Sequence, residues 1–335
     1  MRAHVLTKYG KTNAVLSFEE RRPPALSAGE VRIEVEAVGL NPVDLKTREG
    51  EPKMLLPFVP PFVLGCDLAG RVVEIGIGVT TLRVGDPVYA YAGMDRMGAF
   101  AESVVLAADR VARRPGSLSP EEAACLPLPG LCALNALDAG KVGKGSRVLI
   151  HGGVGGVGGI AVQLASLRGA EVFATVGTSD MERARSLGVG HPIDYRAQLF
   201  EDLAQEMDFV FDTVGGDTLK RSWRVVKRGG TVASLHVPPP ADVLVGAGLR
   251  APWFLRLLLP LITRGPCAAA AKAGARLVPI LSVPSAAGLE RITREAESPG
   301  LRVTVDKVFP FASLGAAFEH MQSGNAKGRV VLKRG

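Results

Sequence analysis

The stretch Val148–Gly158, Val-Leu-Ile-His-Gly-Gly-Val-Gly-Gly-Val-Gly, decides the fold of the second half of the chain. An apolar run predicts a strand that enters a glycine turn, and the turn opens into an apolar helical run, Ile160–Leu167. A second predicted strand, Glu171–Val176, follows at the distance of a βαβ unit. The glycines at 153, 155 and 158 fit G-x-G-x-x-G, in which backbone amides at a helix N-terminus approach a pyrophosphate. The context predicts a dinucleotide-binding turn; a glycine-rich helix entry that binds nothing is the alternative.

Composition restricts the class of protein. With 335 residues and 47% hydrophobic content, the chain can bury two cores, which predicts two globular domains. The net charge of +7 is interspersed along the chain without basic runs, which argues against nucleic acid and favours a small anionic ligand such as a phosphorylated cofactor. The N-terminus has no apolar signal core, which predicts a cytosolic protein. The cysteines are scattered, which predicts reduced thiols; they are Cys66, Cys125, Cys132 and Cys267.

Two kinds of strand pattern divide the chain. The first 120 residues carry short strands with turn signals between them and no long helical period, which predicts a mostly β domain of the barrel type. The strands expected there are 30–38, 68–75, 87–91 and 100–106. After Pro120, apolar strands alternate with helical runs, which predicts a doubly wound parallel sheet covered on both faces. The strands expected there are 147–150, 171–176, 191–194, 208–212, 230–235 and 275–281.

The C-terminal tail returns to the first pattern. A helical run at 286–298 precedes strand-like segments at 302–309 and 328–332. We therefore expect a discontinuous first domain, residues 1–122 and 285–335, and a dinucleotide-binding domain, residues 123–284. The most apolar segment, Ala251–Ile262, is too short to span a bilayer and carries Arg256 and two prolines. It predicts a buried or subunit-facing helix, with a membrane-surface patch as the alternative and membrane association otherwise not expected.

The order and spacing of nine short segments resemble the medium-chain dehydrogenase/reductase superfamily, and within it the zinc-free quinone oxidoreductase and 2-alkenal reductase branch. The resemblance covers nearly the whole chain. It implies a Rossmann domain joined to a GroES-like barrel, NADP(H) as cofactor, a homodimer, and an active site in the cleft between domains. The segments are Asn41-Pro42-Val43-Asp44, Arg48-Glu49-Gly50, Leu64–Gly70, Gly85-Asp86-Pro87-Val88, Gly130-Leu131-Cys132-Ala133, His151–Gly158, Ile193-Asp194-Tyr195, Asp212–Gly216 and Gly328–Leu332.

The residues that hold zinc in other members of the superfamily are missing. Those members have a cysteine at the start of the Asn41 segment, Gly-His-Glu where this chain has Gly65-Cys66-Asp67, and a four-cysteine lobe. Cys66 and Asp67 are neighbours on one strand and point to opposite faces, so a closed tetrahedral site is not expected. Without a Lewis acid a saturated alcohol is a poor hydride donor, whereas a quinone or enone delocalises the incoming charge onto oxygen. The predicted substrate is therefore a quinone or an α,β-unsaturated carbonyl compound.

The resemblance suggests four catalytic candidates. Asn41 is expected near the nicotinamide and substrate, but Asn41 before Pro42 also predicts a helix N-cap with Asp44 at the third helical position. Asp44 and Arg48 also have the i,i+4 spacing of a structural ion pair. Lys46 and Tyr91 are candidate proton donors or oxyanion partners.

The adenosine end of the cofactor site predicts NADPH. An NAD-binding domain carries an acidic residue at the end of the second strand, where this chain has Val176. The resemblance assigns the 2′-phosphate to Thr178, Ser179 and Tyr195, with Arg183 or Arg196 as the cation. Asp180 stands where relatives have a lysine and weakens this assignment, and Ser179 with Glu182 also forms a capping box.

Further cofactor-binding candidates follow from the turn and from the resemblance. Cys132 replaces a threonine common beside the nicotinamide, His151 and His236 have structural alternatives, and Asp212 and Gly215 are expected on the ribose side. The full set is Asn41, Cys132, His151, Gly153, Gly155, Gly156, Val157, Gly158, Thr178, Ser179, Arg183, Tyr195, Asp212, Gly215, His236 and Arg329. Two alternative functions remain open, an enoyl-thioester reductase and a cofactor-binding protein with little turnover.

Overall fold

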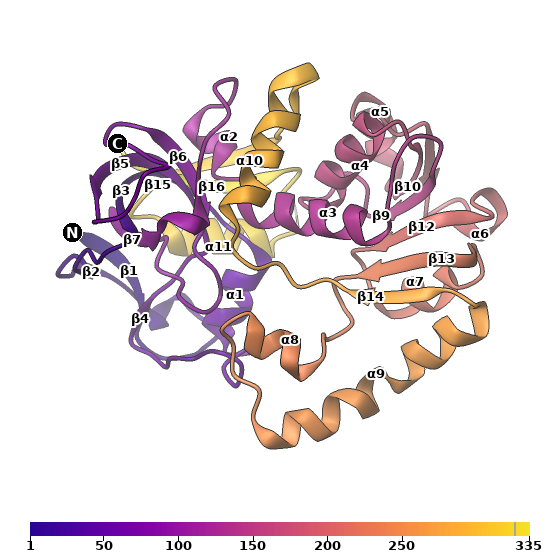
Figure 1. The fold of residues 1–335 in the computed structure, drawn as a ribbon, viewed down its shortest axis with the longest axis horizontal. Helices are drawn as coiled ribbons and strands as arrows, with labels where there is room; N and C mark the ends of the chain where they lie inside the picture. Colours follow the sequence, from indigo (N-terminus) through magenta and orange to yellow (C-terminus); the bar gives the residue numbers. More distant parts are fainter. Residues whose placement is uncertain (325) are drawn as a thin grey trace. The chain divides into compact units, whose positions relative to one another are not determined.

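The computed structural model of the chain describes residues 1–324 and 326–335. The chain divides into two compact units, and the path crosses between them several times (Figure 1). Unit 1 comprises residues 1–131, 244–251 and 283–335, and unit 2 comprises residues 132–243 and 252–282. The predicted domain boundaries, 122/123 and 284/285, remain predictions.

Unit 2 is built on a six-stranded parallel sheet with strand order β11-β10-β9-β12-β13-β14. The chain begins at the centre with β9, runs outward to β11, and then crosses to β12 on the other side of β9. The strand order therefore reverses at β9, and in open α/β sheets such a reversal places the ligand site outside the carboxyl ends of the adjacent strands. The strands are β9 (Arg147–His151), β10 (Glu171–Val176), β11 (His191–Asp194), β12 (Met207–Asp212), β13 (Val226–Ser234) and β14 (Arg276–Pro279).

Helices pack against this sheet because its strands are apolar on both faces. Helix α4 packs on β9 and β10, α7 on β12 and β13, and α9 on β13 and β14. The sheet core includes Leu149, Phe173, Val210 and Val232, none more than 5% exposed. The helices of the chain are α1 (Pro42–Glu49), α2 (Pro120–Ala123), α3 (Pro127–Ala139), α4 (Gly158–Leu167), α5 (Met181–Ser186), α6 (Phe200–Leu203), α7 (Gly216–Ser222), α8 (Ala241–Gly246), α9 (Trp253–Ala273), α10 (Ala286–Glu295) and α11 (Leu314–Gln322).

Unit 1 is mostly β structure. Its main sheet has the order β15-β16-β3-β5-β6-β8, with β7 also paired to β3, and a second sheet has the order β2-β1-β4. The tail joins this unit because β16 pairs with β3, with Leu332 opposite Val38. The strands are β1 (Arg2–Leu6), β2 (Leu16–Glu20), β3 (Glu30–Gly39), β4 (Phe62–Val63), β5 (Asp67–Ile75), β6 (Pro87–Tyr91), β7 (Ser103–Ala107), β8 (Val111–Arg113), β15 (Val305–Pro310) and β16 (Arg329–Lys333). The predicted fold class, a doubly wound parallel sheet with a mostly β GroES-like domain, is confirmed.

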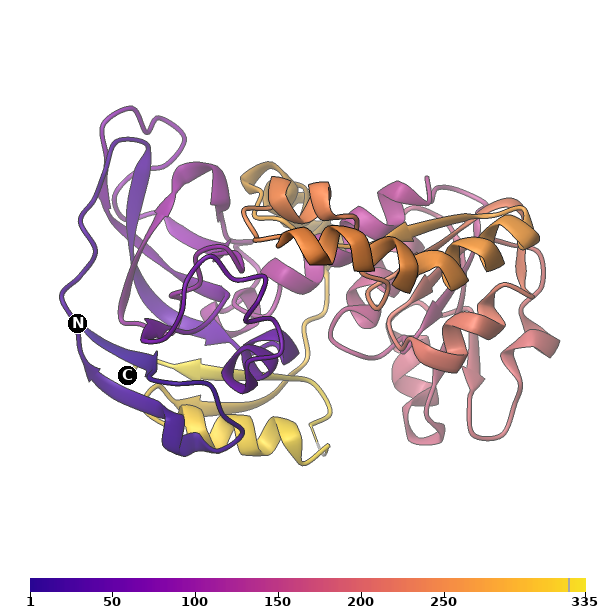
Figure 2. The same cartoon turned by 90° about the horizontal axis from the view of Figure 1, so that it is seen from below.

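The structure corrects the prediction for the apolar segment. Ala251–Ile262 was expected to form a buried or subunit-facing helix; α9 continues to Ala273, and only 11% of its most apolar 18 residues is buried within the chain, so the buried alternative is wrong and the subunit-facing one stays a prediction. By length and composition alone, α9 could cross a membrane. Its outer face is uncovered in Figure 2, where it runs in front of the strands of unit 2.

Candidate functional site

The glycine turn between β9 and α4 has the geometry of an anion site. The Gly153 N–H donates to the Thr175 carbonyl at 3.1 Å, and the Gly155 N–H donates to the Gly152 carbonyl at 2.9 Å. Within the described chain, the N–H groups of Gly156 and Val157 have no hydrogen-bond acceptor. Free amides at the N-terminus of a ten-residue helix attract negative charge through their partial charges and the helix dipole.

The three patterned glycines differ in what a side chain would meet. A Cβ on Gly153 would lie 2.5 Å from the Ala174 side chain, and a Cβ on Gly158 would lie 2.1 Å from the Gly152 carbonyl oxygen. Both positions therefore require glycine for the strand, turn and helix to pack. A Cβ on Gly155 would touch only the Gly152 oxygen, at 3.2 Å, and Gly155 is exposed. Gly155 therefore keeps open the space outside the turn, as a bound pyrophosphate requires.

The end of β10 exposes the groups expected to meet the adenosine. Val176 is buried and stands where an NAD-binding domain carries a carboxylate. Thr178 and Ser179, which follow it, are exposed. Tyr195 is 58% exposed, and the Arg196 guanidinium lies 5.9 Å from the centroid of its ring. The Thr178 hydroxyl hydrogen-bonds to Asp194, which lowers the pKa of that carboxyl.

Asp180 lies at the same place. A Cβ built on Gly177 would be 3.6 Å from Asp180 Oδ2 and 3.8 Å from the Tyr195 hydroxyl. The carboxylate and the phenol therefore flank the same glycine, and a phosphate between them would face one negative charge.

The contacts of His151 fit the structural interpretation rather than the cofactor-binding one. Its side chain is fully buried, with Nδ1 3.2 Å from Thr175 Oγ1 and Nε2 3.1 Å from Ser222 Oγ. Burial lowers the pKa of His151 to about 4. Both ring nitrogens are engaged within unit 2, so the imidazole has no free group for a cofactor.

The end of β12 is held by similar internal bonds. Asp212 is buried, and its carboxylate accepts from the Ser234 hydroxyl at 2.8 Å and the Gly215 N–H at 2.8 Å. His236 is exposed, with Nε2 3.0 Å from the Thr213 carbonyl. The Asp212 carboxylate therefore shapes the turn rather than offering a free group to a ribose. Cys132 is buried and accepts a hydrogen bond from the Ser282 hydroxyl at 3.1 Å.

Asn41 is the centre of a buried polar cluster in unit 1. Its Oδ1 accepts from Arg329 at 2.7 Å, and its Nδ2 donates to Asp67 Oδ2 at 2.9 Å. Its backbone N–H donates to Asp44 Oδ2 at 2.8 Å, while Asp67 Oδ1 accepts from the Leu128 N–H at 3.0 Å. Asn41 occupies the N-cap position of α1, but Arg329 and Asp67 hold its side chain. The amide is therefore fixed in one orientation by residues from β5 and β16.

Burial sets the protonation of this cluster. Asp44 and Asp67 are fully buried, and desolvation raises the pKa of each to about 7. Arg329 opposes that rise, since its guanidinium lies 3.8 Å from Asp67. Burial also raises the pKa of the Cys66 thiol well above its ordinary value. The two carboxyls therefore change protonation near neutral pH, and the Cys66 thiol hydrogen-bonds to the Asp44 carboxyl.

The other catalytic candidates lie differently. The Lys46 side chain is 55% exposed and its ammonium is 3.9 Å from Glu51. Tyr91 is buried on β6, opposite Asp67 in the strand register. The expected pair between Asp44 and Arg48 does not form: Arg48 donates instead to the Asn13 side chain and the Lys11 carbonyl.

Sequence reasoning missed how Asp67 and Arg329 act together. Asp67 was considered only as a metal ligand and Arg329 only as a cofactor contact. An aspartate inside the apolar segment Leu64–Gly70 was a signal, because a buried carboxyl requires partners. Across residues 1–324 and 326–335, no group of three or more His, Cys, Asp or Glu side chains is arranged to hold a metal ion.

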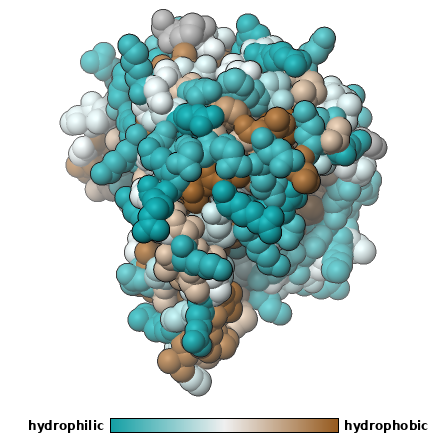
Figure 3. Space-filling model, turned by 90° about the vertical axis from the view of Figure 1, so that its right-hand side faces the viewer, coloured by the Kyte–Doolittle hydropathy of each residue, from teal (hydrophilic) through white to brown (hydrophobic). Residues whose placement is uncertain are grey.

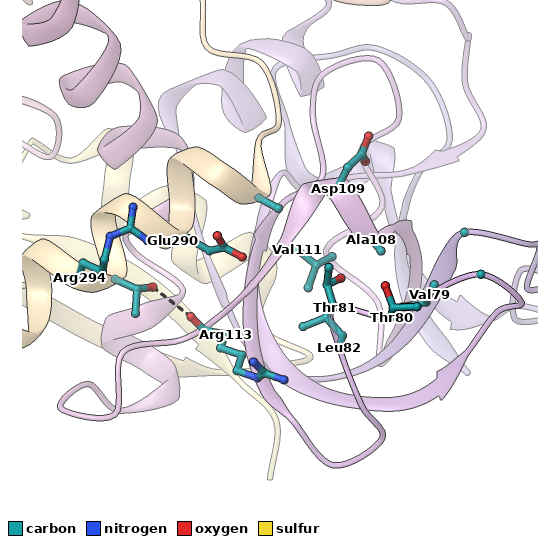
Figure 4. Close-up of a pocket in the computed structure, with 14 residues that line it drawn as sticks. Val79, Thr80, Thr81, Leu82, Ala108, Asp109, Val111, Arg113, Glu290 and Arg294 are labelled. Carbon is teal, nitrogen blue, oxygen red and sulfur yellow. Dashed lines mark hydrogen bonds between the residues drawn. The ribbon is translucent and has the colours of Figure 1, made fainter.

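A separate cavity of about 460 Å³ lies in unit 1, beside β8 and α10 (Figure 4). Glu290 and Arg294 of α10 and Thr80 and Thr81 of the facing loop line it, and Thr293 donates to the Arg113 carbonyl at its edge. None of the predicted site residues lines it.

Comparisons with known proteins agree with this architecture. Residues 27–116 match the family described as "Alcohol dehydrogenase GroES-like domain", and residues 187–332 match "Zinc-binding dehydrogenase". The tomato (Solanum lycopersicum) protein 2-methylene-furan-3-one reductase is 32% identical over 99% of this chain and 79% of its own length. The chain belongs to the medium-chain dehydrogenase/reductase superfamily. It falls in the zinc-free quinone and alkenal oxidoreductase branch, as predicted.

Two further relatives support that placement. The chloroplastic NADPH-dependent alkenal/one oxidoreductase of Arabidopsis thaliana is 31% identical over 99% of this chain and 79% of its own length. The solved quinone oxidoreductase from Coxiella burnetii has a TM-score of 0.82 and 29% identity, with 99% of each chain covered. The protein is thus an NAD(P)H-dependent oxidoreductase with a Rossmann-type dinucleotide-binding domain.

Proposed function

We propose that this oxidoreductase transfers hydride from NADPH to a quinone or an α,β-unsaturated carbonyl compound. The observation that carries the proposal is the glycine turn, where Gly155 leaves space and Gly156 and Val157 present free amides. Relatives described as a quinone oxidoreductase and an alkenal/one oxidoreductase support the class of acceptor.

NADPH rather than NADH is the proposed cofactor. The support is the absence of a carboxylate at Val176, the exposed Ser179, and the exposed Tyr195 with Arg196 beside its ring, whereas the Thr178 hydroxyl is bonded to Asp194. Asp180 opposes the 2′-phosphate electrostatically and limits the preference.

The nicotinamide supplies the hydride, and the chain's own residues orient the reactants and manage protons. We assign the Asn41 amide to contact the nicotinamide or the acceptor, in the orientation that Arg329 and Asp67 impose. Because Oδ1 and Nδ2 are already bonded to Arg329, Asp67 and the Gly39 carbonyl, the amide would contribute a fixed dipole rather than a free hydrogen-bond donor. The buried carboxyls of Asp44 and Asp67, with pKa values of about 7, hold a proton next to that amide.

Steady-state oxidation of NADPH with a panel of quinones, short alkenals and enoyl thioesters tests this proposal. We expect turnover with quinones or alkenals, no oxidation of simple primary alcohols with NADP, and unchanged rates after prolonged chelation. Selective reduction of enoyl thioesters would favour the enoyl-thioester reductase. Tight NADPH binding without turnover would favour a cofactor-binding protein, and chelator-sensitive alcohol oxidation would overturn the zinc-free assignment.

We also propose that the chain forms a homodimer. Strand β14 is the last strand of its sheet and, among the described residues, pairs with β13 alone, so its outer edge offers backbone groups to a second copy. Light scattering during gel filtration gives the mass directly; a monomer at micromolar concentration would contradict the proposal.

A further inference from the structure

Helix α9 presents an apolar face to solvent. Trp253, Leu257 and Leu261 are 75%, 64% and 65% exposed. They are four residues apart, so they lie in one row on the helix surface. Leu258 and Ile262 widen this row and are also exposed. Scattered exposed leucines are common, but a continuous apolar patch of this kind marks an interaction surface.

The opposite side of α9 packs against the protein's own sheet. Leu259 and Ala270 are buried, and α9 packs on β13 and β14 of its own unit. Part of the helix is therefore held against the sheet. A helix fixed in this way presents one side to a surface, and it does not need to leave the protein to do so.

The segment that carries the apolar face has charge of one sign. From Val243 to Leu289 the sequence contains no Asp or Glu, but it contains five basic residues: Arg250, Arg256, Arg264, Lys272 and Arg276. Arg264 and Lys272 are exposed on α9 and form no ion pair with any other described residue. The lower part of the face in Figure 3, at the height of α9 in Figure 1, shows apolar and polar residues side by side.

We propose that the outer face of α9 binds the surface of an anionic lipid bilayer, with the helix in the plane of the interface. Aromatic and leucine side chains on one face, flanked by cations, are the features of helices that insert at the headgroup boundary. Arg264 and Lys272 would meet lipid phosphates, while Trp253, Leu257 and Leu261 would enter the acyl boundary.

The charge pattern selects this occupant over a second copy of the chain. Two copies meeting through α9 would bring like charges together with no carboxylate to compensate them, because the segment has none. An anionic surface compensates the cations and accepts the apolar row at the same time. This inference does not depend on the proposed enzymatic activity.

Vesicle binding by the full chain tests the proposal. The protein is mixed with vesicles of phosphatidylcholine alone or of phosphatidylcholine with phosphatidylglycerol, and the bound fraction is measured by flotation. We expect binding to the anionic vesicles only, and weaker binding as salt rises from about 0.1 M to about 1 M, because the screening length falls from about 10 Å to about 3 Å.

Fluorescence locates the contact. The chain has two tryptophans, Trp253 on α9 and the half-buried Trp223. Brominated lipids in the anionic vesicles should quench the emission of the wild-type protein, and Trp253→Phe should abolish the quenching. Quenching that persists in Trp253→Phe would overturn the assignment to α9.

Two double variants separate the apolar and charged contributions. Arg264→Gln with Lys272→Gln should weaken partitioning roughly 30-fold, and Leu257→Glu with Leu261→Glu should weaken it at least about 100-fold. Matched double controls place such changes on exposed residues elsewhere, Ile77→Glu with Val84→Glu, and Lys8→Gln with Arg22→Gln. The controls should bind as wild type does, and melting temperatures of all variants establish that they fold.

Three outcomes would overturn the proposal. One is the absence of wild-type binding to anionic vesicles at about 0.1 M salt, where electrostatic attraction is strong. The second is equal binding to neutral and anionic vesicles. The third is a dimer that Leu257→Glu with Leu261→Glu dissociates, which would assign the face to a second copy.

Discussion

Replacing Gly155 by valine should abolish dinucleotide binding and leave the fold intact. In the present structure a Cβ at this position meets only the Gly152 carbonyl oxygen, at 3.2 Å, and Gly155 itself is exposed. If the Gly152 carbonyl shifts by a few tenths of an ångström, the added Cβ is accommodated. The valine methyl groups would then project into the space outside the turn, where the amides of Gly156 and Val157 would meet a pyrophosphate.

The expected loss follows from those amides. A hydrogen bond to a charged group contributes about 1.5–3 kcal/mol, so losing one amide–phosphate bond weakens binding roughly 10- to 150-fold. Losing both would weaken it more than about 100-fold. Gly155→Ala, which adds a single methyl group, should lie between the wild type and Gly155→Val.

Gly158→Ala is the matched control. Its Cβ would lie 2.1 Å from the Gly152 carbonyl oxygen, so the turn must move and stability should fall by about 1–3 kcal/mol. For each variant, calorimetric titration measures the affinity for NADPH, and thermal unfolding measures the stability. A folded Gly155→Val protein with wild-type affinity would refute the assignment of the pyrophosphate to this turn. Equal stability of Gly158→Ala and wild type would refute the packing argument.

Three other predictions concern single side chains. Asn41→Ala should slow NADPH oxidation and cost about 1–3 kcal/mol of stability, because Asp67 and Arg329 lose a buried partner; an unchanged melting temperature would contradict this. Asp180→Asn should raise the affinity for NADPH relative to NADH about three- to tenfold in paired titrations, by removing a negative charge near the 2′-phosphate; an unchanged ratio would place that phosphate elsewhere. Burial raises the pKa of Asp44 from 3.8 to about 7, so the folded chain keeps a proton that the unfolded chain releases, and stability falls as pH rises through that interval. Asp44→Asn should remove roughly 1–4 kcal/mol of that fall between about pH 5 and about pH 8 in urea unfolding, and parallel curves for the two proteins would argue against the buried proton.

The sequence predicted the parallel sheet well because its signals are local. Each strand of unit 2 is a short apolar run, and β10 and β11 have the predicted bounds. The glycine turn was equally predictable, since strand, turn and helix are consecutive in the chain. The fold class then followed from the βαβ pattern, whereas the order of the strands was not predicted.

The buried polar cluster was less predictable because it joins distant parts of the chain. Arg329 and Asn41 are 288 residues apart, and Asp67 and Leu128 are 61 residues apart. No periodicity or spacing relates such residues; the pairing of β3 with β16 on one side and with β5 on the other brings Arg329 and Asp67 to Asn41. The exposure of α9 was missed for a related reason, since an apolar run does not specify whether a protein core or another surface covers it.

The cluster explains why the tail must return to the N-terminal sheet. Two buried carboxyls at Asp44 and Asp67 would be unfavourable without a cation, because removing charge from water costs several kcal/mol per ion. Strand β16 begins at Arg329 and supplies that cation, while its backbone pairs with β3. The same strand therefore completes the sheet and fixes the Asn41 amide. Arg329 therefore contributes both to the stability of unit 1 and, together with Asp67, to the orientation of the proposed catalytic amide.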